Sequence, residues 1–301
     1  MSRDKIINDL SDSHVTRLQK SLQELENLVI AEAAKINPKR GTLKARTTVA
    51  LEIRPKLKQY IEQTYLTAVQ SNITEYDEAA KALVTQLSKF PIPDEFKQIT
   101  ELDLTTIQQL KRTAFLPFED VGNEFVNELA QEVYNSTLTG TSTDEMIANL
   151  RGKINGVYQS TDNEEAQELV DFINANPDKP EAVKTAAERL QTIYGRDRLG
   201  NNFRRYATQI VQDSLMGFDG QFAKYRADEL GLNHYKYSGT TVRDSRDFCR
   251  RNVNKVYSEE EIRRIWSTQT WNGKAQGDPF VVRGGYNCRH HWQPTDPDWD
   301  L

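Results

Sequence analysis

Apolar side chains recur at spacings of three and four residues over the first two thirds of the chain, which is the period of one face of an α-helix. The clearest example is the series Val15, Leu18, Leu22, Leu25 and Val29. The pattern does not persist over several heptads, so it favours a helix packed in a bundle over a coiled-coil seam. We therefore predict a succession of helices up to about residue 230.

Two segments that contain proline divide this helical part. PIPDEF, at residues 91–96, has two prolines within three residues, and NPDKP covers residues 176–180. Proline lacks a backbone donor and restricts the residue before it, so helices are expected to end at such segments. We place a first helical region at residues 1–92 and a second at residues 93–201.

The pattern changes near Gly231. HYKYSGTTV alternates aromatic with β-branched residues and predicts a strand, and Ser258 with Glu261 predicts the capping box of a short helix. PFVV is predicted to be a further strand, and GGY a tight turn that positions Cys288. Residues 202–301 should therefore hold a long helix and a small module. The predicted fold is mainly α, with an elongated helical N-terminal body and a small α+β C-terminal domain.

Composition adds to this picture. The hydrophobic fraction is 37%, which is low for a compact globule and fits an elongated helical protein or one whose surfaces are completed by partners. No apolar run approaches the ~20 residues of a membrane helix, and the first ten residues lack the apolar core of a signal peptide. We expect a soluble protein without a membrane anchor, made in a cytoplasm.

Charge is unevenly distributed along the chain. From Leu232 onward there are 11 lysines and arginines against 9 acidic residues, whereas the whole chain has 39 against 44. The first 231 residues therefore carry 28 against 35, a net charge of −7. This balance disfavours a general nucleic-acid coating protein, which needs broad phosphate neutralisation. Local basic pairs remain candidates for phosphate contacts: Arg204–Arg205, Arg250–Arg251 and Arg263–Arg264.

Cysteine and histidine are concentrated near the end of the chain. Five of the six lie in the last 68 residues, and three of them fall within the segment RGGYNCRHHWQP. One interpretation is a structural zinc site, because zinc is bound by thiolates and imidazoles. Cys288 and His290 would supply two ligands from one side of a strand, Cys249 a third, and His234 or His291 the fourth.

Three other interpretations of these residues stay open. Cys249 and Cys288 could form a disulfide, Cys288 could be a nucleophile activated by a histidine, or both cysteines could be small buried hydrophobic residues. Asp244, Asp247 and Asp278 could bind a cation, but acidic loop residues are more often solvated turn formers. No phosphate-binding loop, dinucleotide fingerprint or nucleophile elbow is present. The sequence thus contains no complete catalytic constellation.

An ordered series of short motifs resembles a known family. YSGTTVRDSRDFCRRNVNKVYSEEEI and GDPFVVRGGYNCRHHWQP are similar to the C-terminal domain of the phage head morphogenesis (minor head) proteins typified by Mu protein F. The resemblance lies in the steps Phe248–Arg250, Lys255–Tyr257 and Gly284–His290, and covers the chain from about residue 202. Many members end in Asn-Cys-Arg-Cys and carry a further Cys or His pair upstream. Here the last position is His290, and the upstream pair is reduced to Cys249.

The resemblance implies a non-enzymatic virion protein present in few copies in the phage head near the portal, assembled in the bacterial host cytoplasm. Implied partners are the portal protein, the major capsid or scaffolding protein, other copies of the chain, and packaged double-stranded DNA. Its role would lie in head assembly, DNA packaging or DNA ejection. The competing hypotheses are a metal-dependent nuclease or injected toxin that uses the Cys/His cluster, and a plain DNA-binding module.

Overall fold

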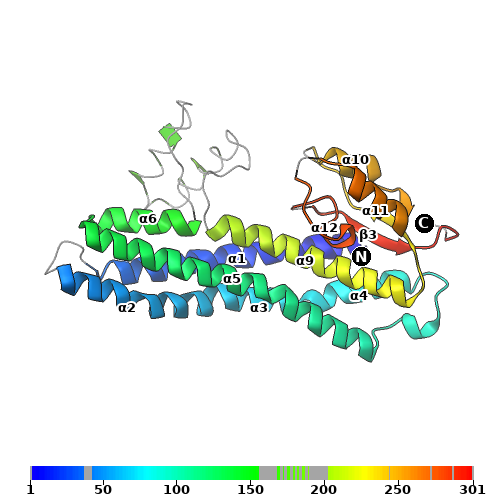
Figure 1. Cartoon of the computed structure of the whole chain (residues 1–301), viewed down its shortest axis with the longest axis horizontal. Coiled ribbons are helices and arrows are strands. Elements are labelled where there is room, and N and C mark those ends of the chain that lie inside the picture. The colour runs from blue at the N-terminus through cyan, green and yellow to red at the C-terminus, as the bar shows by residue number, and fades with distance from the viewer. Residues whose placement is uncertain are drawn as a thin grey trace. The chain divides into compact units, whose positions relative to one another are not determined.

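The structure is a computed structural model that describes residues 2–36, 43–155, 203–243, 245–271, 273–286 and 288–299, with scattered positions between 168 and 189. The described residues are mainly helical, and a small antiparallel sheet lies near the C-terminus (Figure 1). This confirms the predicted fold class of a mainly α chain with a small α+β C-terminal domain. The predicted NPDKP loop lies largely outside the described residues.

The helices of the first part follow the apolar pattern of the sequence. They include α1 (Arg3–Ala33), α2 (Leu43–Ile61), α3 (Thr67–Thr74), α4 (Tyr76–Leu87), α5 (Glu101–Thr139), α6 (Thr143–Asn155) and α9 (Phe203–Glu229). A π-helical turn η1 (Glu62–Leu66) joins α2 to α3, and a 3-10 turn η2 (Asp94–Phe96) lies between α4 and α5. The break predicted at PIPDEF is therefore confirmed.

The chain divides into two compact units, each built from segments that are distant in sequence. Unit 1 contains Met1–Lys20, Tyr65–Asp120 and Ala207–Leu301, and unit 2 contains Ser21–Thr64 and Val121–Tyr206. The boundaries predicted at residues 92 and 201 divide the chain by sequence order and stay predictions.

Unit 2 is a helical unit with an apolar core. Its buried core includes Leu22, Leu25, Val29, Ile53, Leu57, Ile61, Phe125, Leu129, Val133, Leu150 and Phe203. The rings of Phe125 and Phe203 stack with centroids 4.4 Å apart. At its surface, Lys35 and Lys56 lower the pKa of Glu32 to about 2 by hydrogen bonding to its carboxylate.

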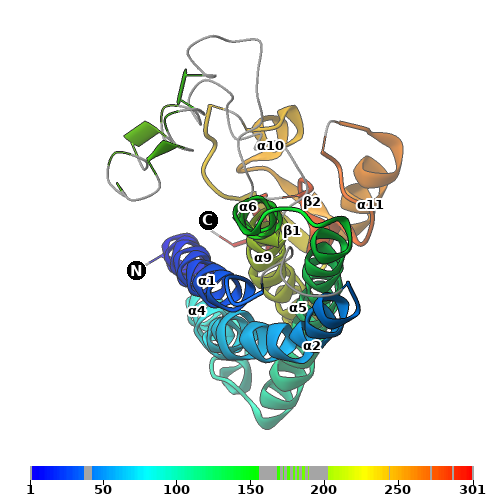
Figure 2. The same cartoon turned by 90° about the vertical axis from the view of Figure 1, so that its left-hand side faces the viewer.

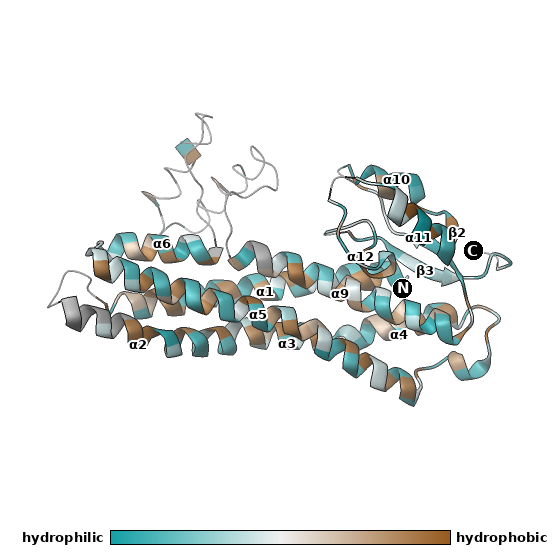
Figure 3. Cartoon of the chain, in the orientation of Figure 1, coloured by the Kyte–Doolittle hydropathy of each residue, from teal (hydrophilic) through white to brown (hydrophobic). Residues whose placement is uncertain are grey.

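Unit 1 packs α1, α4 and α9 side by side (Figures 1 and 2). Phe218 of α9 contacts Tyr76 of α4 with ring centroids 4.9 Å apart, and both side chains are buried. The helices carry both hydrophobic and hydrophilic residues along their length, as the mixed colours of Figure 3 show. Among the described helices, none is both long and apolar enough to cross a membrane.

Two buried ion pairs join distant parts of unit 1. Arg3, in the first turn of α1, contacts both carboxylate oxygens of Asp219 at 2.7 Å, and both side chains are 1% exposed. Arg226 contacts Asp103 at 2.8 Å and also donates to the carbonyl of Phe96. The first residues of the chain are thus fixed to the last long helix, which no local pattern indicates.

The C-terminal module contains a three-stranded antiparallel sheet with the order β2-β1-β3. Its strands are β1 (His234–Ser238), β2 (Val256–Ser258) and β3 (His291–Thr295), and its helices are α10 (Asp247–Asn252), α11 (Glu259–Thr268) and α12 (Pro279–Val282). Tyr235 and Tyr237 of β1 are fully buried, as the alternation in HYKYS predicts. The capping box of Ser258 and Glu261 is present at the start of α11, and that prediction is confirmed.

The prediction of a strand at PFVV was wrong, because this segment forms the short helix α12. Its apolar and β-branched composition favours a strand, but the carboxylate of Asp278 accepts a hydrogen bond from the backbone N–H of Phe280, and Pro279 occupies the first turn. α12 also packs directly on α9. A Cβ atom at Gly220 would lie 2.3 Å from the carbonyl oxygen of Phe280, so glycine is required for this approach.

A buried histidine in unit 1 makes stability dependent on pH. The side chain of His14 has no exposed surface, and its Nε2 lies 3.0 Å from Glu75 Oε2. Burial lowers the pKa of His14, against the opposing effect of Glu75. As pH falls through about 6.5, the unfolded chain therefore takes up a proton that the folded chain does not, at a cost of at most about 1.4 kcal/mol per pH unit.

We expect the free energy of unfolding to fall between pH 7.5 and pH 5.5, and His14→Gln to reduce that slope. Urea unfolding at several pH values measures both effects. His234→Gln is the matched control, because it removes a histidine whose side chain is only half-buried. Equal slopes for the wild-type and His14→Gln proteins would contradict the prediction.

Candidate metal centre

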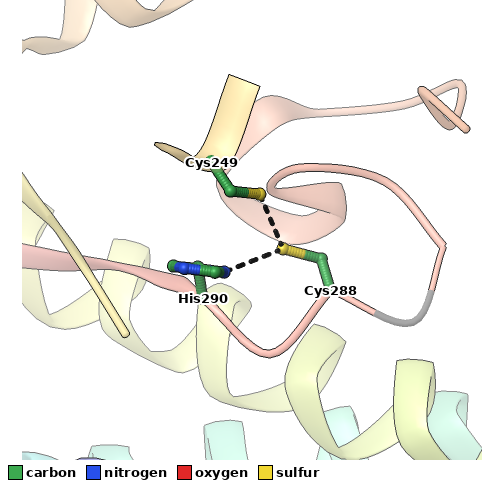
Figure 4. A group of neighbouring side chains, drawn as sticks. All are labelled: Cys249, Cys288 and His290. Atoms are coloured by element: carbon green, nitrogen blue, oxygen red, sulfur yellow. Dashed lines mark hydrogen bonds between the residues drawn. The ribbon is translucent and has the colours of Figure 1, made fainter. Parts of the chain in front are cut away.

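The two cysteines and His290 converge in the core of the C-terminal module. Cys249 comes from α10, whereas Cys288 and His290 come from the turn that leads into β3, and Cys288 lies between the other two (Figure 4). Cys288 Sγ lies 3.8 Å from Cys249 Sγ and 3.7 Å from His290 Nδ1. All three side chains are buried, and their ligand atoms lie within 4.8 Å of one another. They could hold a metal ion.

Aromatic rings enclose the cluster and exclude water from it. The ring of Tyr237 is parallel to that of His290, with centroids 5.3 Å apart, and the ring centroids of Trp292 and Tyr237 are 4.5 Å apart. Phe248, next to Cys249, stacks on Trp271 with centroids 4.1 Å apart. Polar atoms in such surroundings interact more strongly than in water, so the three donors would gain from a shared cation.

A glycine turn shapes the space between the donors. A Cβ atom at Gly284 would lie 2.7 Å from Cys249 Sγ and 2.9 Å from Cys288 Sγ, so any side chain there would fill the cluster. The backbone N–H of Cys288 donates to the carbonyl of Gly285, and the indole N–H of Trp271 donates to the carbonyl of Gly284. This supports the interpretation of GGY as a turn that positions Cys288.

The two cysteines shift each other's pKa in opposite directions. The contact with Cys249 lowers the pKa of Cys288, and His290 and the buried guanidinium of Arg283 act in the same direction. The same contact, together with burial, raises the pKa of Cys249. Two adjacent thiolates would repel each other, and a bound cation would remove that cost.

The structure does not bring His234 to this cluster. His234 pairs with Ser258 and Thr295, whereas the cluster lies beyond the opposite end of β1, where Ser238 pairs with His291. The Nδ1 atom of His234 lies 2.7 Å from the side-chain oxygen of its neighbour Asn233. Four residues of a strand span about 13 Å, so His234 is too far away to serve as the fourth ligand in this arrangement.

His291 is buried, but it belongs to a different set of contacts. Its Nε2 lies 3.2 Å from Asp4 Oδ1. Burial lowers the pKa of His291, and the positive charge of Arg3 lowers it further. Successive side chains of an extended segment point to opposite sides, so His291 faces away from the side that His290 occupies.

The acidic residues named as cation ligands are placed elsewhere or not described. Asp278 caps α12 and lies 3.3 Å from a guanidinium nitrogen of Arg263. Asp247 is exposed in the first turn of α10, and Asp244 lies outside the described residues. Across the part of the chain that the structure describes, Cys249, Cys288 and His290 form the one metal-competent group of cysteine, histidine and acidic side chains.

The disulfide and nucleophile interpretations fit the geometry less well. Both cysteines are free thiols, and their sulfur atoms are 3.8 Å apart, whereas a disulfide requires about 2.05 Å. As a nucleophile, Cys288 would need to reach a substrate, but its side chain is only 4% exposed. A closed site of this kind fits a structural ion better than a catalytic one.

Tyr237 is a member of the cluster that was not predicted from the sequence. Its hydroxyl oxygen lies 3.4 Å from Cys249 Sγ and 3.5 Å from Cys288 Sγ. The alternation in HYKYS places this side chain on the buried face of the strand, which is the signal that could have indicated it.

Comparisons with known proteins identify no relative of this chain. No family model, no curated protein and no solved structure matches this chain.

Proposed function

We propose that this chain is a minor head protein of a tailed bacteriophage, and that a structural zinc ion bound by Cys249, Cys288 and His290 stabilises its C-terminal domain. The observation that carries the proposal is that two of the sequence motifs lie close together in the structure. Phe248–Arg250 and Gly284–His290, which belong to the ordered series that resembles the minor head proteins, contribute all three donors of the buried cluster.

Zinc is the ion that these donors favour, because soft thiolates and an imidazole in a closed site are typical of structural zinc. When bound, the ion would cross-link α10 to the turn before β3, across a sequence separation of 39 residues. The small module has only three short strands, so a cross-link of this kind would supply a large part of its stability.

A structural role in the head fits the closed cluster better than an enzymatic one does. A nuclease or an injected toxin would need a metal site open to substrate, and the three donors are buried. We propose the portal protein and the major capsid or scaffolding protein as partners.

The arginine pairs bear on the proposed contact with packaged DNA. Arg250 donates to the carbonyls of Ser245 and Arg243, and Arg263 contacts Glu259 at 2.8 Å. These arginines are therefore partly used within the module, which favours protein partners over DNA as the main contact.

Quantitative mass spectrometry of purified particles and of empty proheads tests the proposed function. The phage that encodes this chain is the source of both samples, and the copy number is expressed relative to the portal protein. We expect a few copies per particle in both samples, because a protein that takes part in head assembly should be present before and after packaging. Absence of the chain from both samples would overturn the proposal.

A further inference from the structure

We propose that the hydroxyl oxygen of Tyr237 is the fourth ligand of the metal ion, in the position for which the sequence suggested a second histidine. This inference rests on the proposed zinc site and names the donor that completes it. Tyr237 is the last residue but one of the central strand β1, and its side chain is fully buried.

Four distances between the proposed donor atoms are close to those of a tetrahedral zinc site. With Zn–S bonds of about 2.3 Å and Zn–N or Zn–O bonds of about 2.0–2.1 Å, two sulfurs should be about 3.8 Å apart, and a sulfur and a nitrogen or oxygen about 3.6 Å apart. The two sulfur atoms are 3.8 Å apart, and Cys288 Sγ is 3.7 Å from His290 Nδ1. Tyr237 Oη lies 3.4 Å and 3.5 Å from the two sulfurs, which is close to the ~3.6 Å expected for an oxygen that shares an ion with both.

The hydroxyl is directed into the cluster with only the two sulfur atoms as hydrogen-bond partners within the described part of the chain. Sulfur is a weak partner, and a buried tyrosine hydroxyl normally finds a stronger one. The ring is also fixed in place, because it lies parallel to His290 and contacts Phe248 with centroids 5.6 Å apart. An oxygen held rigidly beside two thiols is suited to bind an ion that the thiols share.

Gly284 leaves space beside three of these donor atoms. A Cβ atom there would lie 2.7 Å, 2.9 Å and 3.0 Å from Cys249 Sγ, Cys288 Sγ and Tyr237 Oη. One point is therefore nearly equidistant from three of the four proposed ligand atoms. A side chain at Gly284 would compete with an ion for this space, and glycine avoids that competition.

The charges of this donor set also suit a buried site. The two thiols lose their protons when they bind the ion, and the two thiolates balance its two positive charges. His290 and Tyr237 are then needed only as neutral donors, so the centre carries no net charge. A neutral centre avoids the large cost of burying an unbalanced charge. A thiolate or carboxylate as the fourth ligand would leave the centre negatively charged.

Tyr237→Phe tests the inference, because it removes the oxygen and keeps the ring. Zinc and Co²⁺ affinities are measured in the purified, reduced full-length protein by competition with a chromophoric chelator, and the visible spectrum of the Co²⁺ form is recorded. We expect an affinity loss of about 10–100-fold and a shifted Co²⁺ spectrum, as loss of a donor at a metal site produces. Circular dichroism of the metal-free protein checks that the variant folds.

Tyr235→Phe is the matched control, because Tyr235 is a buried tyrosine of the same strand whose hydroxyl has no hydrogen-bond partner in the structure. It should keep the wild-type affinity and spectrum. Gly284→Ala provides a second test, and should weaken metal binding because its methyl group would displace the donor atoms beside it.

The outcomes separate this inference from the proposal on which it rests. Wild-type protein that binds no zinc or Co²⁺ would overturn the zinc site and the tyrosine ligand together. Wild-type protein that binds one equivalent, with Tyr237→Phe unchanged in affinity and Co²⁺ spectrum, would overturn the tyrosine ligand alone.

Discussion

Replacing Cys288 with serine is expected to abolish stoichiometric zinc binding and to lower the melting temperature of the C-terminal module. Serine is a poor zinc ligand, and Cys288 contacts two other donors, Cys249 and His290. An ion present at 100 times its dissociation constant stabilises the folded state by about 2.7 kcal/mol. At about 4–8 °C per kcal/mol for a domain of about 60–100 residues, that corresponds to a loss of roughly 10–20 °C.

Removing zinc from the wild-type protein with a chelator should produce a similar loss, whereas the Cys288→Ser protein should not respond to the chelator. Thermal unfolding followed by circular dichroism, with and without chelator, measures both effects. Elemental analysis of the purified, reduced protein gives the stoichiometry.

His234→Ala is the control for this experiment. The sequence suggested His234 as a ligand, but in the structure its nearest polar partner is Asn233, so the variant should retain zinc. Wild-type protein that carries less than about a tenth of an equivalent of metal would rule out a structural zinc site, since such sites bind tightly.

Replacing Asp219 with alanine is expected to destabilise the protein by about 3–5 kcal/mol, because it leaves the charge of Arg3 buried without a counter-ion. Both side chains of this pair are 1% exposed, and the contact is bidentate at 2.7 Å. The remaining hydrogen bond of Arg3 to Gln86, at 3.4 Å, is long and neutral, so it cannot replace the carboxylate.

Chemical denaturation measures this loss, and Asp228→Ala is the matched control. Asp228 lies on the same helix and pairs with Lys224, but its side chain is 59% exposed, so its removal should cost less than about 1 kcal/mol. The double variant Arg3→Met, Asp219→Leu should recover most of the lost stability, because apolar residues can replace a buried ion pair. Equal effects of Asp219→Ala and Asp228→Ala would contradict the prediction.

The ion pair also explains why the start of the chain belongs to the same unit as its end. Arg3 and Asp219 are separated by 216 residues, and Asp12 contacts Arg289 at 2.9 Å across an even longer separation. The first turns of α1 therefore help to hold α9 and the turn before β3, which places the candidate metal centre in a unit anchored by both ends of the chain.

Elements whose signals are local could be predicted from the sequence. The apolar stripe of α1 could be predicted because a helix repeats every ~3.6 residues. Its members Leu18, Leu22, Leu25 and Val29 are all buried. The capping box of α11 and the break at PIPDEF were predictable because their signals lie within a few consecutive residues. The concentration of cysteine and histidine also indicated which residues of the tail would form a cluster, and Cys249, Cys288 and His290 do converge.

The tertiary structure alone decided which groups meet across long separations. A strand at PFVV was predicted from composition, but the cap of Asp278 and the packing of α12 on Gly220 make it a helix. His234 was a reasonable ligand by residue type, yet the sheet register places it at the far end of β1 and brings the hydroxyl of Tyr237 to the sulfurs instead. Local propensity cannot decide such matters, because register, buried charge pairing and donor geometry depend on side chains that are remote in sequence.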